Sequence, residues 1–279
     1  MQETQTTLKE RIRRRFKFLS WPLTVFDESE ELRKQDFPLK EKAKKTRFPV
    51  RALRYWWAVC AIQEETRRLR RSPIIADAGC DLGTLKRFFL HIKEGHWIGL
   101  DLPDQLRSNQ KQLELACYDE LVSCNLDSEI PLSESSVDIV VCLHVLEHLP
   151  RPDFTMGELA RILRPGGLLL LGYPVLPRVL AHIRQWQFSK QLKNGKRKMG
   201  QHIQAFWPGQ SRRLAEQVGL QVEFMIGSHL IRISGSPLEN YAAWIRLNQL
   251  WGGLFPSLGR EICIQLRKNP AGSRSLFSE

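Results

Sequence analysis

The sequence lacks several features that would each indicate a particular class of protein. No apolar run of about 18 residues occurs in the 279-residue chain, so no membrane-spanning helix is predicted. The basic N-terminal stretch KERIRRRFKF leads into no apolar segment of a signal peptide, which favours a cytoplasmic protein. The six cysteines form no C-x-x-C pair and no Cys/His cluster at metal-ligand spacing, so we expect a reducing compartment and no metal.

Acidic residues are missing from one long stretch, and the charge of the chain is uneven. Residues 178–213 contain nine Lys/Arg and no Asp or Glu, within a chain whose net charge is +12. Residues 1–71 contain 19 Lys/Arg against 10 Asp/Glu. Such regions suit an anionic partner, either nucleic acid, anionic lipid or a phosphorylated substrate. A solvated basic face with no partner is the alternative.

The middle of the chain alternates short apolar runs with helical patterns. Strands that are apolar throughout and alternate with helices indicate a parallel sheet covered on both faces. The pattern predicts strands over residues 73–80, 96–102, 120–126, 136–146, 168–175, 221–227 and 260–268. It predicts helices over 83–93, 103–116, 151–167, 209–220 and 236–255, the third of them stopped by Pro165-Gly166-Gly167.

These patterns predict one α/β domain with additions and not two separate cores. Residues 1–71 read as a basic, partly helical arm or lid with a leading helix over 50–70. The domain itself spans 72–270, and a basic insertion interrupts it at 176–213. Residues 271–279 form a C-terminal tail.

The first strand is followed by DAGCDLG, residues 77–83, where a nucleotide-binding turn is expected. Gly79 and Gly83 allow the tight backbone that such a turn requires. Asp77 and Asp81 flank the turn, and each carboxylate would repel an added pyrophosphate by about 1–4 kcal/mol. The turn therefore suits a ligand with positive charge and no phosphate. An ordinary turn capped by acids is the alternative.

Polar residues also follow the next strands. Asp101 ends the second strand, where a carboxylate can accept hydrogen bonds from a ribose diol. Asn125 and Asp127 follow the third strand and could meet an adenine amino group. The segment CLHVLEHLP, residues 142–150, follows the fourth strand.

Taken together, these motifs resemble the class I S-adenosylmethionine-dependent methyltransferases. The segments that carry the resemblance are DAGCDLG, GLDL, SCNLDSEIPLSESSVDIVVCLHVLEHLP and RILRPGGLLLLGYP. It covers residues 70–175 well and 200–270 more loosely. It implies a Rossmann-like, doubly wound fold with a mostly parallel seven-stranded sheet whose last strand is antiparallel. The implied cofactor is S-adenosylmethionine, a sulfonium without phosphate.

The resemblance also implies a set of cofactor contacts at the ends of the strands. Asp77 would orient the ammonium of the cofactor, and Asp101 would bind its ribose hydroxyls. The implied contacts are Asp77, Gly79, Cys80, Gly83, Asp101, Leu102, Asn125, Leu126, Leu143 and His144. Leu102, Asn125 and Leu126 belong to the adenine pocket, and the glycines and Cys80 to the methionine part. The sequence departs from the family pattern at Asp81, where a glycine is usual, and at Asn125, for which Asp127 is the alternative.

Methyl transfer to an O–H nucleophile needs alignment and a general base. His144, His148, Tyr173 and His202 are the candidates, since each is expected near the carboxyl edge of the sheet. No N-P-P-Y turn of amide and nucleobase N-methylating enzymes is present. Cys142 lies inside a strand and is expected in the core, so no cysteine fits carbon-5 pyrimidine methylation.

Three functional readings remain open from the sequence. The first is a methyltransferase acting on a small-molecule, sugar or lipid-type acceptor. The second is an RNA methyltransferase that uses the basic arm. The third is a cofactor-binding protein at the membrane surface, because the segment 240–255 with its Trp and Leu residues could lie on an anionic membrane.

Overall fold

The computed structural model describes residues 16–34, 39–89, 94–193, 200–229, 231 and 233–270. The predicted tail 271–279 lies outside the described residues, as do the first part of the arm, 1–15, and part of the basic insertion, 194–199. Among the described residues, no helix is both long and apolar enough to cross a lipid bilayer.

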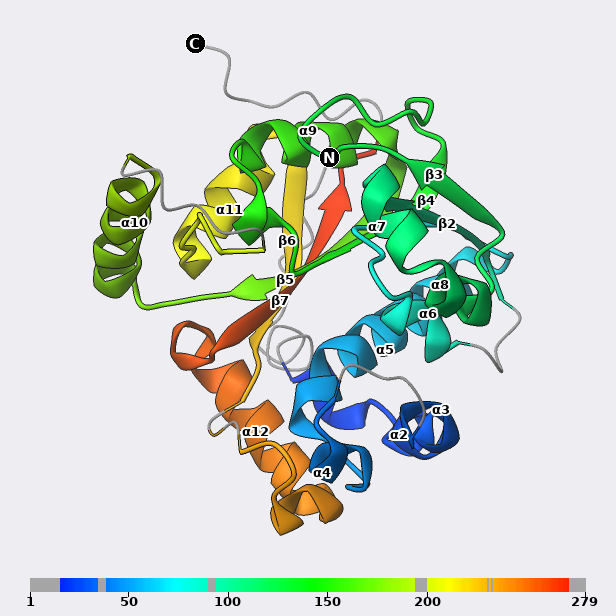
Figure 1. Cartoon of the computed structure of the whole chain (residues 1–279), viewed down its shortest axis with the longest axis vertical. Coiled ribbons are helices and arrows are strands. Elements are labelled where there is room, and N and C mark those ends of the chain that lie inside the picture. Colours follow the sequence, from blue (N-terminus) through cyan, green and yellow to red (C-terminus); the bar gives the residue numbers. More distant parts are fainter. Residues whose placement is uncertain are drawn as a thin grey trace, which may run out of the picture.

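A seven-stranded sheet forms the centre of the molecule, in the order β3-β2-β1-β4-β5-β7-β6 (Figure 1). Neighbouring strands from β3 to β5 pair in parallel, and β7 is antiparallel to both β5 and β6. This confirms the predicted mostly parallel sheet with an antiparallel last strand. The strands are β1 Ile74–Ala78, β2 His96–Asp101, β3 Glu120–Ser123, β4 Val137–Leu143, β5 Leu163–Pro174, β6 Leu220–Gly227 and β7 Glu261–Lys268.

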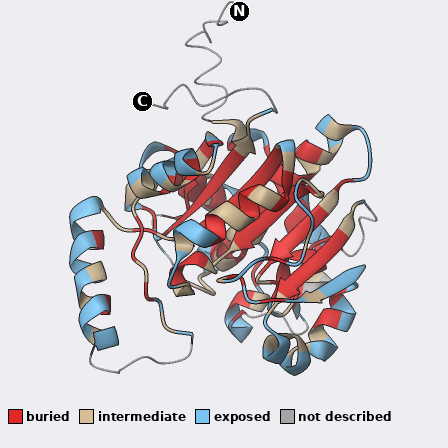
Figure 2. Cartoon of the chain, turned by 90° about the horizontal axis from the view of Figure 1, so that it is seen from above, coloured by how far each residue is buried: buried red, intermediate tan, exposed pale blue. Residues whose placement is uncertain are grey.

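Helices cover both faces of this sheet, because the side chains of each strand alternate between two cores. Ile139 and Val141 of β4 belong to the core under α5 and α12, whereas Val140 and Cys142 belong to the core under α9 and α11. Figure 2 shows the strands as almost continuously buried. The long helices are α5 Leu53–Leu69, α9 Pro152–Ile162, α10 Arg178–Lys193, α11 Pro208–Gln217 and α12 Ala242–Leu254.

Shorter helices join these layers. The short α-helices are α2 Thr24–Glu28, α3 Glu30–Lys34, α4 Glu41–Lys44, α6 Thr84–Arg87, α7 Pro103–Ser108 and α8 Gln110–Ala116. Single 3-10 turns are η1 Lys17–Ser20, η2 Val50–Ala52, η3 Leu146–His148, η4 Pro237–Asn240 and η5 Pro256–Leu258. The helix predicted over 103–116 is thus two helices that meet at Asn109.

The described part of the N-terminal arm packs into the core under α5. Phe18, Trp21 and Phe26 are each at most 2% exposed. The Trp21 ring lies 5.8 Å from the ring of Phe224 in β6, and the Trp56 indole of α5 donates to the carbonyl of Pro22. Trp56 is therefore a packing residue.

The prediction that Pro165-Gly166-Gly167 stops a helix over 151–167 is wrong. Helix α9 ends at Ile162, and β5 begins at the next residue. Leu163 pairs with Val137, but Leu168 pairs with Ile139, so the strand bulges between these pairs. Gly166 takes a positive φ of 74° within the bulge, which glycine adopts without steric cost. The glycines are needed for the bulge rather than for a helix cap.

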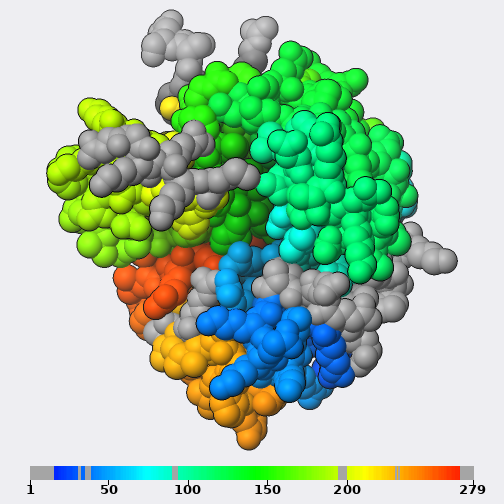
Figure 3. Space-filling view, in the orientation of Figure 1, coloured from blue at the N-terminus to red at the C-terminus, as the bar shows by residue number. Residues whose placement is uncertain are grey.

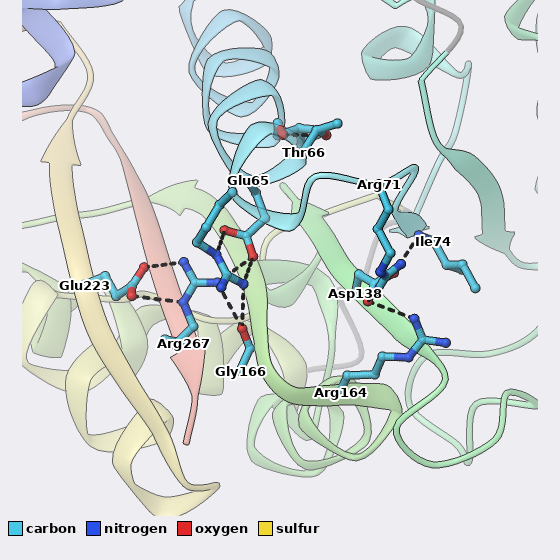
Figure 4. Close-up of polar contacts among 11 residues, drawn as sticks. Glu65, Thr66, Arg71, Ile74, Asp138, Arg164, Gly166, Glu223 and Arg267 are labelled. Atoms are coloured by element: carbon cyan, nitrogen blue, oxygen red, sulfur yellow. Dashed lines mark hydrogen bonds and ion pairs between the residues drawn. The ribbon is translucent and has the colours of Figure 1, made fainter. Parts of the chain in front are cut away.

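Ion pairs tie the elements together at the amino edge of the parallel strands (Figure 4). The Asp138 carboxylate accepts from Arg71, Arg164 and the backbone N–H of Ile74, which joins the starts of β1, β4 and β5. Nearby, Arg267 of β7 pairs with Glu65 of α5 and with Glu223 of β6. Both clusters lie at the edge opposite the carboxyl ends of the parallel strands β1, β4 and β5.

Candidate active site

The segments singled out in the sequence meet at the carboxyl edge of the sheet. The strand order reverses between β1 and β4, which is where ligands bind in open parallel sheets. Figure 3 shows the surface hollowed near the middle of the view, between the yellow-green of α10, the green and teal of the β1–β4 half and the blue N-terminal helices.

The turn after β1 is held in shape by two close approaches. Gly79 has a φ of 80°, and a Cβ there would lie 2.3 Å from Cγ2 of Val145, which follows β4. Gly83 has a φ of 64°, and its Cβ would lie 2.5 Å from Cβ of Ala116 in α8. The two glycines therefore let the turn lie directly against the segment after β4 and against α8.

Asp81, which replaces the usual middle glycine, also takes a positive φ, of 45°. Aspartate tolerates this region better than most residues. Its backbone N–H donates to Oδ2 of Asp101 at 2.8 Å, and its Oδ1 accepts from the side-chain amide of Asn109 at 2.9 Å. Asp81 thus links the turn to β2 and α8, and it does not cap α6.

Asp77 is 5% exposed at the end of β1 and accepts a hydrogen bond of 2.6 Å from the Tyr118 hydroxyl. Burial raises the pKa of the Asp77 carboxyl to about 7, and the charge of Asp101 adds to this increase. Burial also raises the pKa of Asp101, although the hydrogen bonds from the N–H groups of Asp81 and Leu102 act in the opposite direction. Three carboxyl groups therefore face one small region, which disfavours a phosphate and favours a cation.

Asp101 keeps both carboxylate oxygens in defined positions. Oδ1 accepts from the N–H of Leu102 at 2.8 Å, while Oδ2 accepts from the N–H of Asp81. Each carboxylate oxygen can accept a further hydrogen bond, so the group remains able to bind a diol. The Leu102 side chain is 44% exposed beside it.

The remaining predicted cofactor contacts differ in their surroundings. Asn125 is exposed, and its Oδ1 accepts from the N–H of Asp127. Leu126 is only 6% exposed and packs in the core under α9. Cys80 is 5% exposed; its N–H donates to the carbonyl of Leu100, as does that of Gly79. The structure therefore places Asn125 at the surface near the carboxyl edge, and the Leu126 side chain in the core.

His144 lies at the end of β4 between two carboxylates, and Leu143 before it packs against the core under α5. The His144 backbone has a φ of 60°, and its Nδ1 lies 3.1 Å from Oε1 of Glu147. Its Nε2 lies 3.6 Å from Oε2 of Glu261, whose other oxygen accepts from Arg54. Burial favours the neutral imidazole, but the neighbouring carboxylates of Glu147 and Glu261 outweigh burial and raise the pKa of His144.

His148 and His202 also meet, although they are 54 residues apart in the chain. Their ring centroids are 4.8 Å apart, and burial lowers the pKa of His202. Glu147, His148 and His202 each offer one ligand atom, and these atoms lie within 4.8 Å of one another. The three side chains could hold a divalent cation, an arrangement that the sequence reasoning missed because His202 follows a different strand.

Tyr173 lies apart from this group. Its side chain is 1% exposed, its ring centroid lies 4.5 Å from that of Phe206, and burial raises the pKa of its hydroxyl. The structure therefore brings His144, His148 and His202 together around Glu147, and it places Tyr173 within the core under α9 and α11.

A pocket of about 520 Å³ adjoins the histidines. It is lined by the end of β5 and the residues after it (174–177), by α10, by the segment 202–206 and by the loop 257–261. Glu261 lines the pocket and also lies next to His144, so the pocket connects to the carboxyl end of β4.

Residues 76–171 match a family model described as a methyltransferase domain. The match runs from β1 to β5 and contains the glycine turn, Asp101 and the segment after β4. This part of the chain is therefore similar to the methyltransferase domain family. The matched segment covers about a third of the chain, and the arm, α10 and the last two strands lie outside it.

Two curated relatives are also named as methyltransferases. The "Probable methyltransferase ltbC" of Aspergillus luteorubrus is 28% identical over 117 residues, 36% of this chain and 40% of that protein. An uncharacterized methyltransferase of Mycobacterium ulcerans is 48% identical over 46 residues, 16% of this chain and 18% of that protein. The chain thus spans less than half the length of each of these relatives.

Among solved structures, a proposed sarcosine dimethylglycine methyltransferase of Galdieria sulphuraria is similar in fold. Its TM-score is 0.57 at 18% identity, over 77% of this chain and 85% of that one. At this identity the likeness shows the fold alone.

Proposed function

We propose that this protein is an S-adenosylmethionine-dependent methyltransferase whose acceptor is a small molecule. The observation that carries the proposal is the pair of carboxyl residues, Asp77 and Asp101, that lie beside the glycine turn of the matched segment. A sulfonium with an ammonium and no phosphate suits that charge distribution better than a dinucleotide does.

The residues present fit this cofactor. Asp77 would accept from the ammonium, and Asp101 would accept from the ribose hydroxyls through the oxygens that Leu102 and Asp81 already hold in place. The half-exposed Leu102 side chain would pack on the adenine. When bound, S-adenosylmethionine supplies an electrophilic methyl group.

The acceptor would occupy the pocket between β5 and α10. A volume of about 520 Å³ is within the usual range for small-molecule sites, roughly 300–1,000 Å³. Arg184, Gln204, Arg260 and Glu261 offer it polar contacts, and Phe188 an apolar one. A sugar, a lipid-type molecule or another metabolite with a polar group would fit this lining.

His144 is the side chain best placed to act as general base. Glu147 fixes the ring through Nδ1, and Nε2 is directed to the pocket side, where Glu261 lies. In its neutral form His144 would take the proton that an O–H acceptor loses as its oxygen is methylated. Glu147 and Glu261 would stabilise the imidazolium that results. His202 itself lines the pocket, and it lies beside Glu147 and His148.

The RNA alternative is less well supported, because several cations of the basic arm are used within the molecule. Lys17 pairs with Glu64, Arg47 with Asp27, and Arg54 with Glu261. The Arg33 guanidinium is buried and donates to the carbonyl of Phe26. Fewer cations of the basic arm are therefore free to contact the phosphates of RNA than the sequence suggests.

Calorimetry with S-adenosylmethionine tests the cofactor assignment. Asp101→Ala should weaken binding at least tenfold, and Asp104→Ala, an exposed carboxylate on the adjacent α7, should not. Transfer of a labelled methyl group to fractionated cell extract then tests the acceptor. We expect the wild type to label the small-molecule fractions and His144→Gln to leave them unlabelled. Label in RNA alone would contradict the proposal.

A further inference from the structure

Helix α10 presents an unusual outer surface. Val179, Leu180, Ile183 and Trp186 are 70%, 52%, 50% and 63% exposed, and residues three or four apart lie on one face of a helix. Only Ala181 and Phe188 of its 16 residues are buried. Figure 2 shows the helix at the left edge of the molecule, exposed along most of its length. Among the described residues, α11 exposes no large apolar side chain and α9 only Phe154.

The same helix is positively charged throughout. It contains Arg178, Arg184, Lys190 and Lys193 and no acidic residue. Lys190 Nζ lies 5.4 Å from the centre of the Trp186 ring, so a cation borders the exposed apolar row. A helix with an exposed Trp and aliphatic residues beside cations is typical of helices that lie in a membrane interface. Anionic lipids attract such a helix further.

The inner side of α10 is fastened to the pocket. The Gln185 side chain donates to the carbonyl of Ile203 and accepts from the N–H of Ala205. Arg184 and Phe188 line the pocket itself. The inner side of α10 therefore lines the pocket and is attached to the segment 203–205 by hydrogen bonds. The exposed apolar row on its outer side does not pack against the sheet.

Helix α12 gives an internal comparison. Leu247, Leu250 and Leu254 are 47%, 38% and 42% exposed. Its one cation, Arg246, donates to the carbonyls of Phe18 and Trp21 and so points to the arm. The exposed face of α12 is apolar but carries no cation. Positive charge therefore distinguishes α10 from α12, which lies in the segment 240–255 that the sequence indicated as the membrane contact.

We propose that the outer face of α10 docks on the surface of an anionic lipid membrane and places the acceptor pocket next to the lipid. An amphiphilic acceptor would then reach the pocket from the bilayer with its polar group toward His144. The delivery of the acceptor rests on the proposed function, whereas the docking does not require cofactor or catalysis.

Vesicle flotation of the full chain tests the docking. The vesicles are phosphatidylcholine alone, or phosphatidylcholine with about one third phosphatidylglycerol. We expect the wild type to float with the anionic vesicles only and to be released by high salt. The double variant Ile183→Ser/Trp186→Ser should lose about tenfold or more in partitioning. Lys190→Gln/Lys193→Gln should lose severalfold at low salt, and the matched α12 variant Leu250→Ser/Leu254→Ser should bind as the wild type does.

Several results would overturn the docking. They are an absence of flotation, equal flotation with neutral vesicles, or an equal loss in the α12 variant. Sedimentation showing that Ile183→Ser/Trp186→Ser converts a dimer into a monomer would assign the face to a second copy of the chain. An RNA gel shift that anionic vesicles do not compete away would assign it to nucleic acid. Calorimetry separates membrane docking from the proposed methyltransferase function, since the α10 variants should bind S-adenosylmethionine as the wild type does.

Discussion

At the scale of single residues, the burial of Asp77 controls the charge of the candidate cofactor site. Its pKa of about 7 means that the carboxyl is partly protonated at neutral pH, in contrast to an exposed aspartate. An ammonium placed against it would favour the ionised form, so binding of the cofactor and loss of this proton should be coupled.

We therefore expect the affinity for S-adenosylmethionine to depend on pH. Below about pH 7 the protonated carboxyl must ionise before it can bind the ammonium, so the association constant should fall up to about tenfold per unit. The Asp77→Asn variant should bind S-adenosylmethionine more weakly, and its affinity should depend little on pH between about pH 5.5 and 7.5. Calorimetry across this range is the measurement, with Asp104→Asn as control. A wild-type affinity that is constant over the range would contradict the role of Asp77.

Asp81 should matter less than its position in the turn suggests. Asp81 contacts the Asp101 carboxylate through its backbone N–H, which a glycine would retain. A glycine would also adopt the φ of 45° with less strain than aspartate does. Asp81→Gly should therefore keep the affinity for S-adenosylmethionine within about threefold and lose only the bond to Asn109. A loss as large as that of Asp101→Ala would instead show that the Asp81 carboxylate contacts the cofactor.

At the scale of elements, the ion pairs at the amino edge of the sheet stabilise the fold at a distance from the candidate cofactor site. The Asp138 side chain is 4% exposed and joins three strands through Arg71, Arg164 and the N–H of Ile74. Although burial opposes it, hydrogen bonding to Arg71 and the other donors lowers the pKa of Asp138 to about 2. The carboxylate therefore stabilises the folded state above its ordinary pKa, and this contribution is lost as pH falls from about 4 to about 2.

Asp138→Asn should lower the free energy of unfolding by about 2 kcal/mol at pH 7, because the two arginines, partly exposed, lose their charged partner. The difference from the wild type should shrink as pH falls towards 2. Urea unfolding at several pH values checks this, with the exposed Glu129→Gln as control. Affinity for S-adenosylmethionine should not change, since the cluster lies at the edge opposite the candidate site.

At the scale of the whole molecule, the N-terminal arm and the sheet share one core. The Trp21 ring lies 5.8 Å from the rings of both Trp56 and Phe224, and its indole donates to Glu64. These contacts join the arm, α5 and β6, which are distant in sequence. The segment 16–48 is thus attached to the α/β domain in its described part; that it also covers the acceptor stays a prediction.

Trp21→Ala should lower the free energy of unfolding by about 3–5 kcal/mol, the usual cost of removing a large buried aromatic side chain. Because the core is continuous, calorimetry should show a single transition with equal calorimetric and van't Hoff enthalpies. A separate low-temperature transition for the arm, with the main transition unchanged, would show that the two fold independently.

Local patterns predicted much of the fold. The apolar runs identified all seven strands. The signal is most direct for the buried strands such as β1 and β4, because a strand buried on both faces needs apolar side chains throughout. They misplaced the end of α9, since the bulge at Gly166 depends on pairing with β4. They also missed α10, because most of its apolar side chains are exposed and form no stripe that faces a core.

The sequence by itself determined the parallel order, the glycine turn and the acids that end β1 and β2, because adjacent parallel strands bring their carboxyl ends to one edge. Only the tertiary structure decided which distant side chains complete that edge. Tyr118 reaches Asp77, Glu261 reaches His144, and His202 joins Glu147, although the last two partners are 117 and 55 residues away in the chain. No local pattern encodes such pairings, since they arise from how helices and loops pack around the sheet.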